Sequence, residues 1–275
     1  MISYITSRSN PNVVRCASLQ EKKYREKYTS FLVEGVKLLE EAVLFSMEIT
    51  DIFVLEEKKE NFLPKIEELL GKESMEKTNV FLVSSPCFEK ISTEKSPQGI
   101  ITVIKCLDFF QSCIKINKES ISKKDTVLIL DSVRDPGNLG AVIRSAAAFS
   151  IGTVLLSEDC ADITNPKTLR GAMGAVFKIR FIRVSDLAES IAYLCAENRR
   201  VFAAELKEGA LPLSQVKPSL QDVFVIGNEG HGLQRCVSSS CTASVYIPIC
   251  ETTESLNASV AASILLWEQY KGSKL

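Results

Sequence analysis

The stretch TVLILDSVRDPGNLGAVIRSAAAFSIGTVLLS, residues 126–157, decides the fold that the rest of the chain must join. Its two short apolar runs, 126–131 and 153–157, have the composition of buried strands. Between them, the small and apolar residues of 138–149 favour a helix, and Asp135-Pro136-Gly137 forms a turn before it. A strand, a helix and a second strand in this order predict two parallel strands joined by a helix.

The same alternation continues to the end of the chain. Further strand-like runs lie at 177–184, 201–206, 223–227 and 244–249, with helical runs at 166–173, 186–198 and 257–270. This pattern predicts an α/β fold with a mostly parallel sheet and helices on both faces. In such sheets, ligands bind beyond the carboxyl ends of the strands.

Residues 1–107 are interpreted as a smaller, separate α/β domain. Asn10-Pro11 is typical of a helix start, and 36–45 has a helical period. Strand-like runs occur at 31–35, 51–55, 79–83 and 99–105. The polar stretch 108–124 is predicted to be a linker, and 125–275 the second domain.

Composition excludes several classes of protein. The 275 residues are 45% hydrophobic, and 33 Lys and Arg balance 34 Asp and Glu, so the chain is not a polycation. No apolar run is long enough to predict a membrane span, and the N-terminus does not have the pattern of a signal peptide. Nine cysteines without a CxxC pair, together with a single histidine, argue against a zinc site. We expect reduced cysteines in a cytoplasmic protein without a metal.

Polar residues of unusual type follow three of the predicted strands. In the first loop, Asn138 is interpreted either as a helix cap or as a functional residue. Arg144 lies in an otherwise apolar helix, so it is expected to pair with a carboxylate or to face an anionic ligand. In the second loop, GNEGHG at 227–232 places three glycines around Glu229, which lets a ligand approach the backbone. This loop does not match the GxGxxG pattern of dinucleotide-binding folds.

The third loop follows the strand-like run 244–249 and leads into the helix 257–270. Ser255 is interpreted either as the N-cap of that helix or as a site residue, and Asn257 as a first-turn residue or a site residue. Leu256, Val260, Ile264, Leu265 and Trp267 then form a wide apolar stripe. The three loops taken together indicate a function far more specifically than any one loop does.

The three motifs DSVRDPGNLGAVIRSA, IGNEGHGL and IPICETTESLNASVAAS resemble, in order and spacing, those of the SpoU/TrmH family of RNA ribose 2′-O-methyltransferases. The resemblance covers about 125–270. The segments ITSRSNPNVV, FLVEGVKLLEEA and SPQGIITVI are similar to the RNA-binding domain that precedes the catalytic domain in many members. The resemblance implies a deep trefoil knot in the C-terminal domain, a homodimer formed through that domain, and S-adenosylmethionine as cofactor.

The resemblance also implies roles for individual residues. The active-site positions fall on Asn138, Arg144, Glu229, Ser255 and Asn257. Glu229 is expected to brace the site, with Arg144 as one candidate partner. The cofactor positions fall on Gly227, Asn228, Gly232, Ile247, Pro248, Ile249 and Leu256. By the resemblance, Arg144 matches the residue proposed as general base in the family. Arginine has a pKa above about 12, so we instead expect Arg144 to position a phosphate and stabilise the developing oxyanion.

RNA recruitment is expected from the first domain. Residues 5–30 carry six Lys and Arg against two Glu, with Tyr24 and Tyr28 between them. The cluster, Arg8, Arg15, Lys22, Lys23, Arg25 and Lys27, is interpreted as an RNA-binding surface, the alternative being a solvated helix face. The predicted activity is that of an EC 2.1.1 enzyme acting on ribosomal RNA. A tRNA ribose methyltransferase and a non-catalytic RNA-binding or ribosome-assembly factor remain alternatives.

Overall fold

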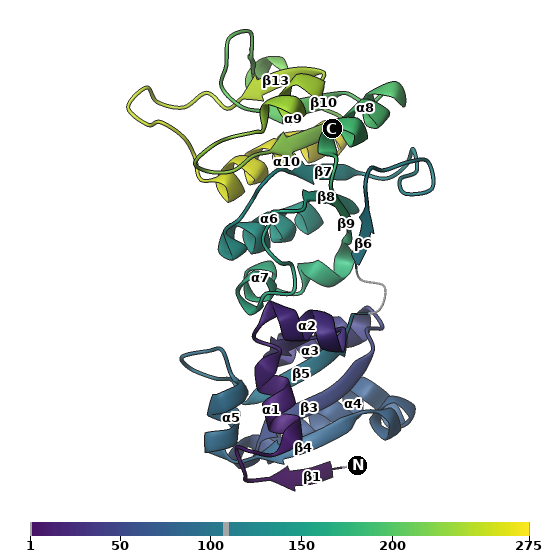
Figure 1. The fold of residues 1–275 in the computed structure, drawn as a ribbon, viewed down its shortest axis with the longest axis vertical. Coiled ribbons are helices and arrows are strands. Elements are labelled where there is room, and N and C mark those ends of the chain that lie inside the picture. The colour runs from purple at the N-terminus through teal and green to yellow at the C-terminus, as the bar shows by residue number, and fades with distance from the viewer. Residues whose placement is uncertain (1, 107–109, 275) are drawn as a thin grey trace. The chain divides into compact units, whose positions relative to one another are not determined.

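The computed structural model describes residues 2–106 and 110–274, and these residues form two sheets (Figure 1). The chain divides into two compact units. Unit 1 comprises Met1–Leu107 together with Thr164–Phe177, and unit 2 comprises Asp108–Ile163 and Lys178–Leu275. The short segment 164–177, expected within the second domain from sequence, therefore packs with the N-terminal unit.

Unit 1 is built on a mixed sheet of five strands in the order β1-β4-β3-β5-β2. The strands are β1 (Ile2–Ile5), β2 (Ser30–Glu34), β3 (Ile49–Leu55), β4 (Asn79–Val83) and β5 (Ile100–Lys105). β4 pairs in parallel with both β1 and β3, whereas β5 runs antiparallel to β2 and β3. All four strand-like runs predicted before residue 107 are strands, and β1 is an additional one.

The helices of unit 1 cover this sheet. They are α1 (Pro11–Ser18), α2 (Lys22–Tyr28), α3 (Val36–Leu44), α4 (Lys59–Lys77), α5 (Ser85–Ile91) and α7 (Pro166–Ala172). Asn10 caps α1 as its sequence predicts, because its side chain accepts a 2.9 Å hydrogen bond from the Asn12 amide. α1 and α5 supply Val13, Cys16 and Phe88 to a buried apolar core beneath β3 and β4.

Unit 2 is built on an eight-stranded sheet in the order β11-β13-β10-β12-β7-β8-β9-β6. The strands are β6 (Phe110–Cys113), β7 (Val127–Leu130), β8 (Thr153–Ser157), β9 (Arg180–Val184), β10 (Val201–Ala204), β11 (Leu211–Pro212), β12 (Val223–Ile226) and β13 (Ala243–Tyr246). Every pair of neighbours is parallel. The predicted parallel sheet is confirmed.

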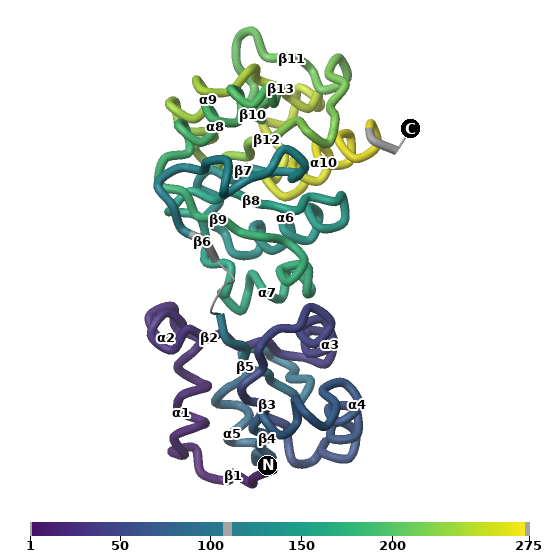
Figure 2. Tube along the Cα trace, turned by 90° about the vertical axis from the view of Figure 1, so that its right-hand side faces the viewer, coloured from purple at the N-terminus to yellow at the C-terminus, as the bar shows by residue number. Residues whose placement is uncertain are grey.

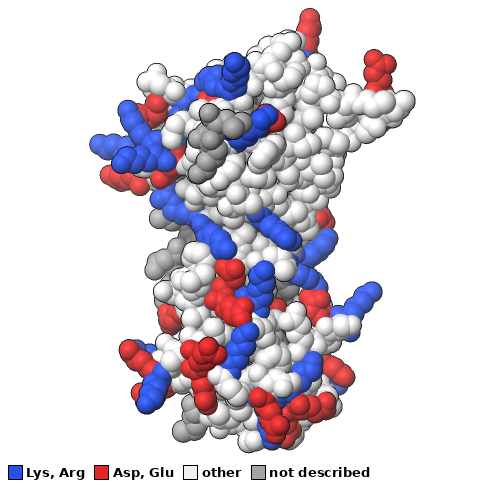
Figure 3. Space-filling view, turned by 180° about the vertical axis from the view of Figure 1, so that it is seen from behind, with Lys and Arg blue, Asp and Glu red and all other residues white. Residues whose placement is uncertain are grey.

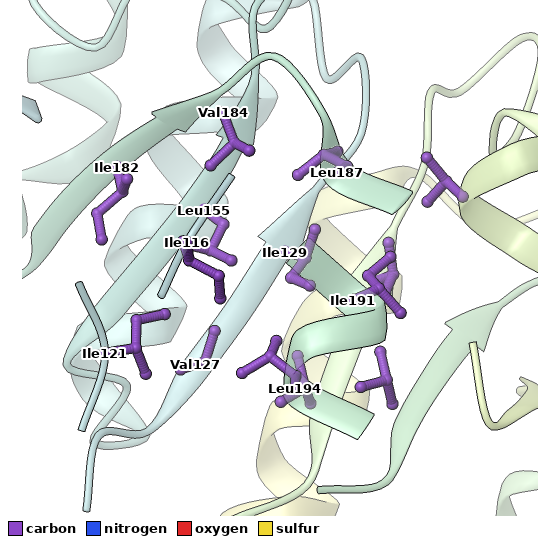
Figure 4. Packing of buried hydrophobic residues seen from close by; sticks show 14 residues of the cluster. Ile116, Ile121, Val127, Ile129, Leu155, Ile182, Val184, Leu187, Ile191 and Leu194 are labelled. Carbon is purple, nitrogen blue, oxygen red and sulfur yellow. The ribbon is translucent and has the colours of Figure 1, made fainter. Parts of the chain in front are cut away.

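Helices lie on both sides of this sheet: α6 (Pro136–Ala148), α8 (Leu187–Ala196), α9 (Arg235–Ser240) and α10 (Ala258–Lys274). Figure 2 shows α6 and α10 on one side of the strands and α8 and α9 on the other. Because side chains alternate along a strand, Val127 and Ile129 of β7 point to the α8 side. There they pack with Ile191 and Leu194 in a fully buried cluster (Figure 4).

The predicted linker 108–124 is wrong in part. Residues 107–109 lie outside the described part of the chain, but β6, which follows directly, pairs in register with β9 as an edge strand of the sheet. Ile116 and Ile121 are also buried, at 1% and 5% exposure, in the same cluster as β7. The many polar residues of this stretch led to the prediction of a linker, whereas its few apolar residues anchor it to unit 2.

Short 3₁₀ turns at Glu56–Lys58, Ala175–Lys178 and Leu213–Gln215 complete the secondary structure. Among residues 2–106 and 110–274, no helix has the length and apolar character needed to cross a membrane. Within the same residues, no three His, Cys, Asp or Glu side chains are grouped so as to hold a metal ion.

Candidate active site

The three loops singled out from sequence all leave the sheet at the carboxyl ends of strands. The first follows β7, the second follows β12 and the third follows β13. β7 and β12 are direct neighbours, and β13 is separated from β12 only by β10. Because these strands are parallel, their carboxyl ends meet at one edge of the sheet, where ligands bind in folds of this class.

A continuous hydrogen-bonded chain joins one side chain from each loop. The Asn138 amide group donates to Glu229 Oε1 at 2.5 Å. The Asn257 amide group in turn donates to Asn138 Oδ1 at 3.0 Å. Three of the five predicted active-site residues are thus brought together from positions up to 119 residues apart. This arrangement fixes the Asn138 side chain between an acceptor and a donor.

The structure shows which residues cap helices α6 and α10. α6 begins at Pro136, and its N-cap is Asp135, whose side chain accepts from the Asn138 backbone amide at 2.9 Å. The Asn138 side chain is therefore not a cap. At α10, which begins at Ala258, Asn257 caps the helix by accepting from the Ser259 amide at 2.9 Å, so the alternative of Ser255 as the N-cap is excluded.

Arg144 and Glu229 do not pair, contrary to one expectation. Arg144 is exposed on α6, and in the described part of the chain it forms no ion pair. The carboxylate of Glu229 is instead engaged by Asn138. The Arg144 guanidinium thus remains available to an anionic group from outside the chain.

The glycine loop is held in shape by its own hydrogen bonds. Asn228 and Gly232 exchange backbone hydrogen bonds of 3.0 and 2.9 Å. The Asn228 side chain accepts from the amides of Gly230 and His231 and donates to the Ser132 carbonyl at 2.9 Å. A Cβ on Gly227 would lie 2.6 Å from the Gly232 carbonyl carbon, so glycine is required there by the loop itself.

Asp131 was not singled out from sequence, yet it anchors the glycine loop. It is fully buried at the end of β7 and accepts hydrogen bonds from both the backbone and side-chain amides of Gln234, each at 2.8 Å. A buried carboxylate needs such donors to offset its desolvation. The signal available in the sequence was an acidic residue placed directly after four apolar strand residues.

A cavity in unit 2 with a volume of about 590 Å³ lies along the third loop. Its lining includes five predicted site residues: Ile247, Pro248, Ile249, Ser255 and Leu256. Gly227, Asn228 and Gly232 do not line it. Its size and largely apolar walls are those of a site for a small organic cofactor.

Sequence reasoning missed one wall of this cavity, which is formed by Ala204, Glu205 and Leu206 at the end of β10. Burial acts to raise the pKa of Glu205, but hydrogen bonds from Lys207, Ser238 and Ser244 outweigh it and lower that pKa. Glu205 therefore stays ionised, and two of its donors come from elements that flank β10. The available signal was a charged residue, Glu205, within the otherwise apolar strand-like run 201–206.

The basic cluster of unit 1 separates into two groups. Arg25 is only 6% exposed, and its guanidinium donates to the carbonyls of Leu19 and Gln20 and to Thr164 Oγ1. The prediction of Arg25 as an RNA-binding residue is therefore wrong, because its donors are used inside the unit.

The other members of the cluster have their charged groups at the surface. Arg15 forms a 2.6 Å salt bridge with Asp51, and Lys22 and Lys23 form exposed ion pairs with Glu26 and Glu21. Lys23 and Lys27 also lie over the rings of Tyr24 and Tyr28, which stack on each other. Arg8 is exposed as well.

Comparison with known proteins places this geometry in a family. Residues 125–267 match the model of the SpoU rRNA methylase family, and residues 10–102 match that of the MRM3-like substrate-binding domain. The chain belongs to the SpoU rRNA methylase family.

The chain is similar over nearly its whole length to several members. It is 31% identical to the 23S rRNA (guanosine(2553)-2′-O)-methyltransferase RlmP of Bacillus subtilis, over 96% of this chain and 97% of that protein. It is 32% identical to the 23S rRNA (guanosine-2′-O-)-methyltransferase RlmB of Acinetobacter baylyi, over 80% and 88%. The structure of an AdoMet-bound rRNA methyltransferase from Sinorhizobium meliloti superposes with a TM-score of 0.82 at 27% identity, covering 97% of each chain.

These matches confirm the prediction of an S-adenosylmethionine-dependent rRNA 2′-O-methyltransferase, an enzyme of the EC 2.1.1 class. The cavity of about 590 Å³ accords with that cofactor, because its lining combines apolar residues with the polar side chains of Glu205, Glu254 and Ser255.

Proposed function

We propose that the three loops at the carboxyl edge of the unit 2 sheet form the active site for transfer of a methyl group to a ribose 2′-hydroxyl. The observation that carries this proposal is the hydrogen-bonded chain Asn257–Asn138–Glu229, which links all three loops beside the adjoining cavity. When bound, S-adenosylmethionine would supply the methyl group, and the leaving group is good because the sulfonium becomes a neutral thioether. The enzyme's task is then alignment of the hydroxyl and removal of its proton.

The cofactor-binding residues are assigned in two groups. Ile247, Pro248, Ile249 and Leu256 line the cavity and supply its apolar contacts. Gly227, Asn228 and Gly232 contribute by holding the neighbouring loop in a conformation whose backbone groups face the cofactor. The second assignment is supported by the loop's internal hydrogen bonds and by the absence of room for a side chain at Gly227.

Arg144 orients the RNA in this proposal. Its exposed guanidinium has no carboxylate partner among the described residues, and a planar fork of donors suits a phosphate. It also stabilises the negative charge that develops on the attacking oxygen. Asn138 and Asn257 orient the ribose, Glu229 holds Asn138 in place, and Ser255 lies at the boundary between cofactor and RNA.

The test is Arg144→Ala, with methyl transfer to ribosomal RNA and calorimetric binding of S-adenosylmethionine measured in parallel. We expect transfer to fall by at least about 100-fold, as for loss of a transition-state donor, while cofactor affinity changes less than about twofold. Lys118→Ala, an exposed cation near the opposite edge strand β6, is the control and should alter neither. Loss of cofactor binding in Arg144→Ala would contradict the assignment.

The class of RNA that is methylated is inferred from the similar proteins. RlmP and RlmB are named as 23S rRNA guanosine 2′-O-methyltransferases, and an N-terminal substrate-binding domain precedes the catalytic domain here. We infer a guanosine of ribosomal RNA as the target and the cytoplasm as the location. Ribose-methylation mapping of total RNA from a deletion strain tests this, since loss of a tRNA mark alone would overturn it.

Unit 1 recruits the RNA in this proposal, with Arg8, Arg15, Lys22, Lys23 and Lys27 as phosphate contacts. Lys22, Lys23 and Lys27 all belong to α2, which also carries the stacked rings of Tyr24 and Tyr28. These rings offer a surface on which unpaired bases can stack. The ion pairs of Lys22 with Glu26 and of Lys23 with Glu21 are exposed, so exchanging the carboxylate for a phosphate costs little.

We further propose a homodimer formed through α6 and α10. Val260 and Trp267 of α10 are 47% and 48% exposed, although Trp267 also packs against Phe149 at 5.8 Å. Figure 3, which looks onto the α6 and α10 side of unit 2, shows a broad area there with few charged side chains. Such a surface is typical of an interface between subunits.

The C-terminal trefoil knot implied by the family is also proposed for this chain. After β13, near the edge of the sheet, the chain returns through residues 247–257 so that α10 packs on α6 and β12 near its centre. A return of this kind brings the C-terminal segment across loops that are already in place. An experimental structure whose backbone closes without a knot would overturn the proposal.

A further inference from the structure

A second cavity in unit 2, of about 280 Å³, lies between the first loop and the glycine loop. Ser132, Arg134 and Asp159 form one wall, and Asn228, His231 and Gly232 form another. The function proposed above uses neither Arg134 nor Asp159. The glycine loop connects the two sites, because Glu229 of the hydrogen-bonded chain lies between Asn228 and His231.

Arg134 is held in a defined orientation at this cavity. Its Nε and Nη2 groups both donate to Asp159 Oδ2, at 3.2 and 2.6 Å. Asp159 Oδ1 accepts from the hydroxyls of Ser132 and Ser157, at 3.0 and 2.7 Å. Within the described residues the guanidinium makes no other hydrogen bond, so the edge that carries Nη1 remains available to a ligand.

The backbone beneath this pair is strained. Ser132 adopts a left-handed conformation with φ of 60°, which is unfavourable for a residue other than glycine. Three contacts hold it there: its amide donates to Ser157 Oγ at 2.8 Å, its hydroxyl donates to Asp159, and its carbonyl accepts from Asn228. Strain that is maintained by several neighbours is concentrated at ligand sites.

The chemistry of the cavity favours a neutral ring with acceptor atoms. Arg134 and Asp159 cancel in formal charge, so a phosphate gains little there. The cavity is slightly smaller than the roughly 300–1,000 Å³ of a site for a drug-sized molecule, which suits a single base better than a whole nucleotide. The free edge of an arginine fork matches the O6 and N7 acceptors of guanine.

We propose that this cavity binds the guanine base of the nucleotide that is methylated, with Arg134 donating to O6 and N7 and His231 providing a ring for stacking. Asp159 is a positioning residue that keeps the arginine fork facing the base. The inference rests on the proposed function, since it places the base next to the loop that carries Glu229 and hence the ribose next to Asn138.

The experiment combines a change in the enzyme with a change in one atom of the RNA. Transcripts of the small- and large-subunit ribosomal RNA genes are made with guanosine or with 7-deazaguanosine, which lacks the N7 acceptor. The kcat/KM of methyl transfer is measured for the wild type and Arg134→Gln on both RNAs. Any misfolding of the substituted RNA affects both enzymes equally and cancels in the comparison.

We expect Arg134→Gln to lower kcat/KM on normal RNA by about 5- to 150-fold, the range for loss of a bidentate base contact. Substitution with 7-deazaguanosine should lower the wild-type value but leave the Arg134→Gln value nearly unchanged. Arg134→Lys should not restore activity, because a point charge cannot replace the fork. Arg235→Gln, an exposed arginine outside this cavity, should respond to the RNA as the wild type does.

Two outcomes would overturn the inference. Equal losses for both enzymes on 7-deazaguanosine RNA would show that Arg134 does not read N7. Rescue by Arg134→Lys together with a weaker salt dependence would identify a phosphate contact instead. Failure of the wild type to methylate either unmodified RNA would instead contradict the proposed function, so the two failures are distinguishable.

Discussion

At the scale of single residues, Gly227 connects the sequence motif to the structure of the site. The motif alone predicted glycines that let a ligand approach the backbone. In the structure, the space beside Gly227 is filled by the backbone of Gly232 and Leu233, at 2.6 to 2.8 Å from the position of a Cβ. Glycine is therefore needed at position 227 so that the loop can pack against itself, and this packing shapes the site.

We expect Gly227→Ala to destabilise unit 2 by about 3 kcal/mol, the upper part of the range for an overpacked interior. The neighbouring backbone cannot yield as a flexible side chain could. Urea unfolding measures this change, and S-adenosylmethionine affinity should fall with it. Gly230→Ala is the control, since its Cβ would lie 3.5 Å from Asn228 Oδ1 in ordinary contact. Equal stability of the two variants would contradict the packing argument.

The carboxyl group of Asp159 makes the stability of the fold depend on pH. Burial acts to raise its pKa, but hydrogen bonds from Ser157, Arg134 and Ser132 outweigh it and lower the pKa from 3.8 to about 2. Because the folded-state pKa lies below the unfolded value, its stabilising contribution is present above about pH 4 and is lost as the pH falls towards 2. Solvent screening reduces its size, since the side chain is 39% exposed.

The measurement is the free energy of unfolding at about pH 5 and about pH 2.5. We expect a smaller fall for Asp159→Asn than for the wild type, because the asparagine cannot lose a charge. Glu158→Gln is the matched control, since this exposed neighbour makes no side-chain hydrogen bond in the described part of the chain. An identical fall in Asp159→Asn and the wild type would count against the shifted pKa.

At the scale of elements, helix α2 shows how one charged segment serves two purposes. Its buried Arg25 ties the helix to Leu19, Gln20 and Thr164, whereas its lysines lie at the surface. Positive charge in the sequence did not distinguish them. Helical geometry separates Arg25 from Lys23 and Lys27, because residues two positions apart on a helix point to nearly opposite faces, one meeting protein and the other solvent.

We therefore expect opposite effects from changes within α2. Arg25→Ala should cost about 3 kcal/mol, because it leaves buried acceptors without donors, and should impair RNA binding only through that loss. The triple change of Lys22, Lys23 and Lys27 to Ala should leave the unfolding free energy within about 0.5 kcal/mol. It should instead reduce the log–log salt slope of RNA binding by about 0.7–0.9 for each lost phosphate contact. An unchanged slope would identify the lysines as an ordinary solvated face.

At the scale of the whole molecule, α6 and α10 present a surface with few charged side chains on the side of the sheet opposite α8 and α9. Within the subunit they are joined by the hydroxyls of Ser145 and Ser263 at 2.7 Å and by packing of Phe149 on Trp267. The apolar side chains that remain exposed are suited to a second copy of the same helices.

We expect the enzyme to sediment at about twice its 30.4 kDa chain mass and the double change Val260→Glu and Trp267→Glu to yield monomers, because charges at the centre of an apolar contact are costly. Cofactor affinity should fall as well, since α10 follows directly from the cavity-lining third loop. Leu44→Glu, at an exposed apolar residue of unit 1, is the control. A wild-type monomer that binds S-adenosylmethionine would contradict the proposed dimer.

The sequence by itself determined the parallel α/β sheet, the three loops at its carboxyl edge and the family. Strand and helix periodicity reports local burial, and the motif residues lie within short segments, so both can be read without long-range information. For the same reason β4 and β8 begin and end where predicted.

Only the tertiary structure decided the contacts between residues that lie far apart in the chain. It joined Asn138 to Glu229 and Asn257 rather than Arg144 to Glu229, buried Arg25 against Thr164, and packed residues 164–177 with unit 1. It also paired β6 with β9 within a stretch expected to be a linker. Such contacts depend on how several elements pack together. The sequence pattern within one element does not indicate which distant side chains will contact it.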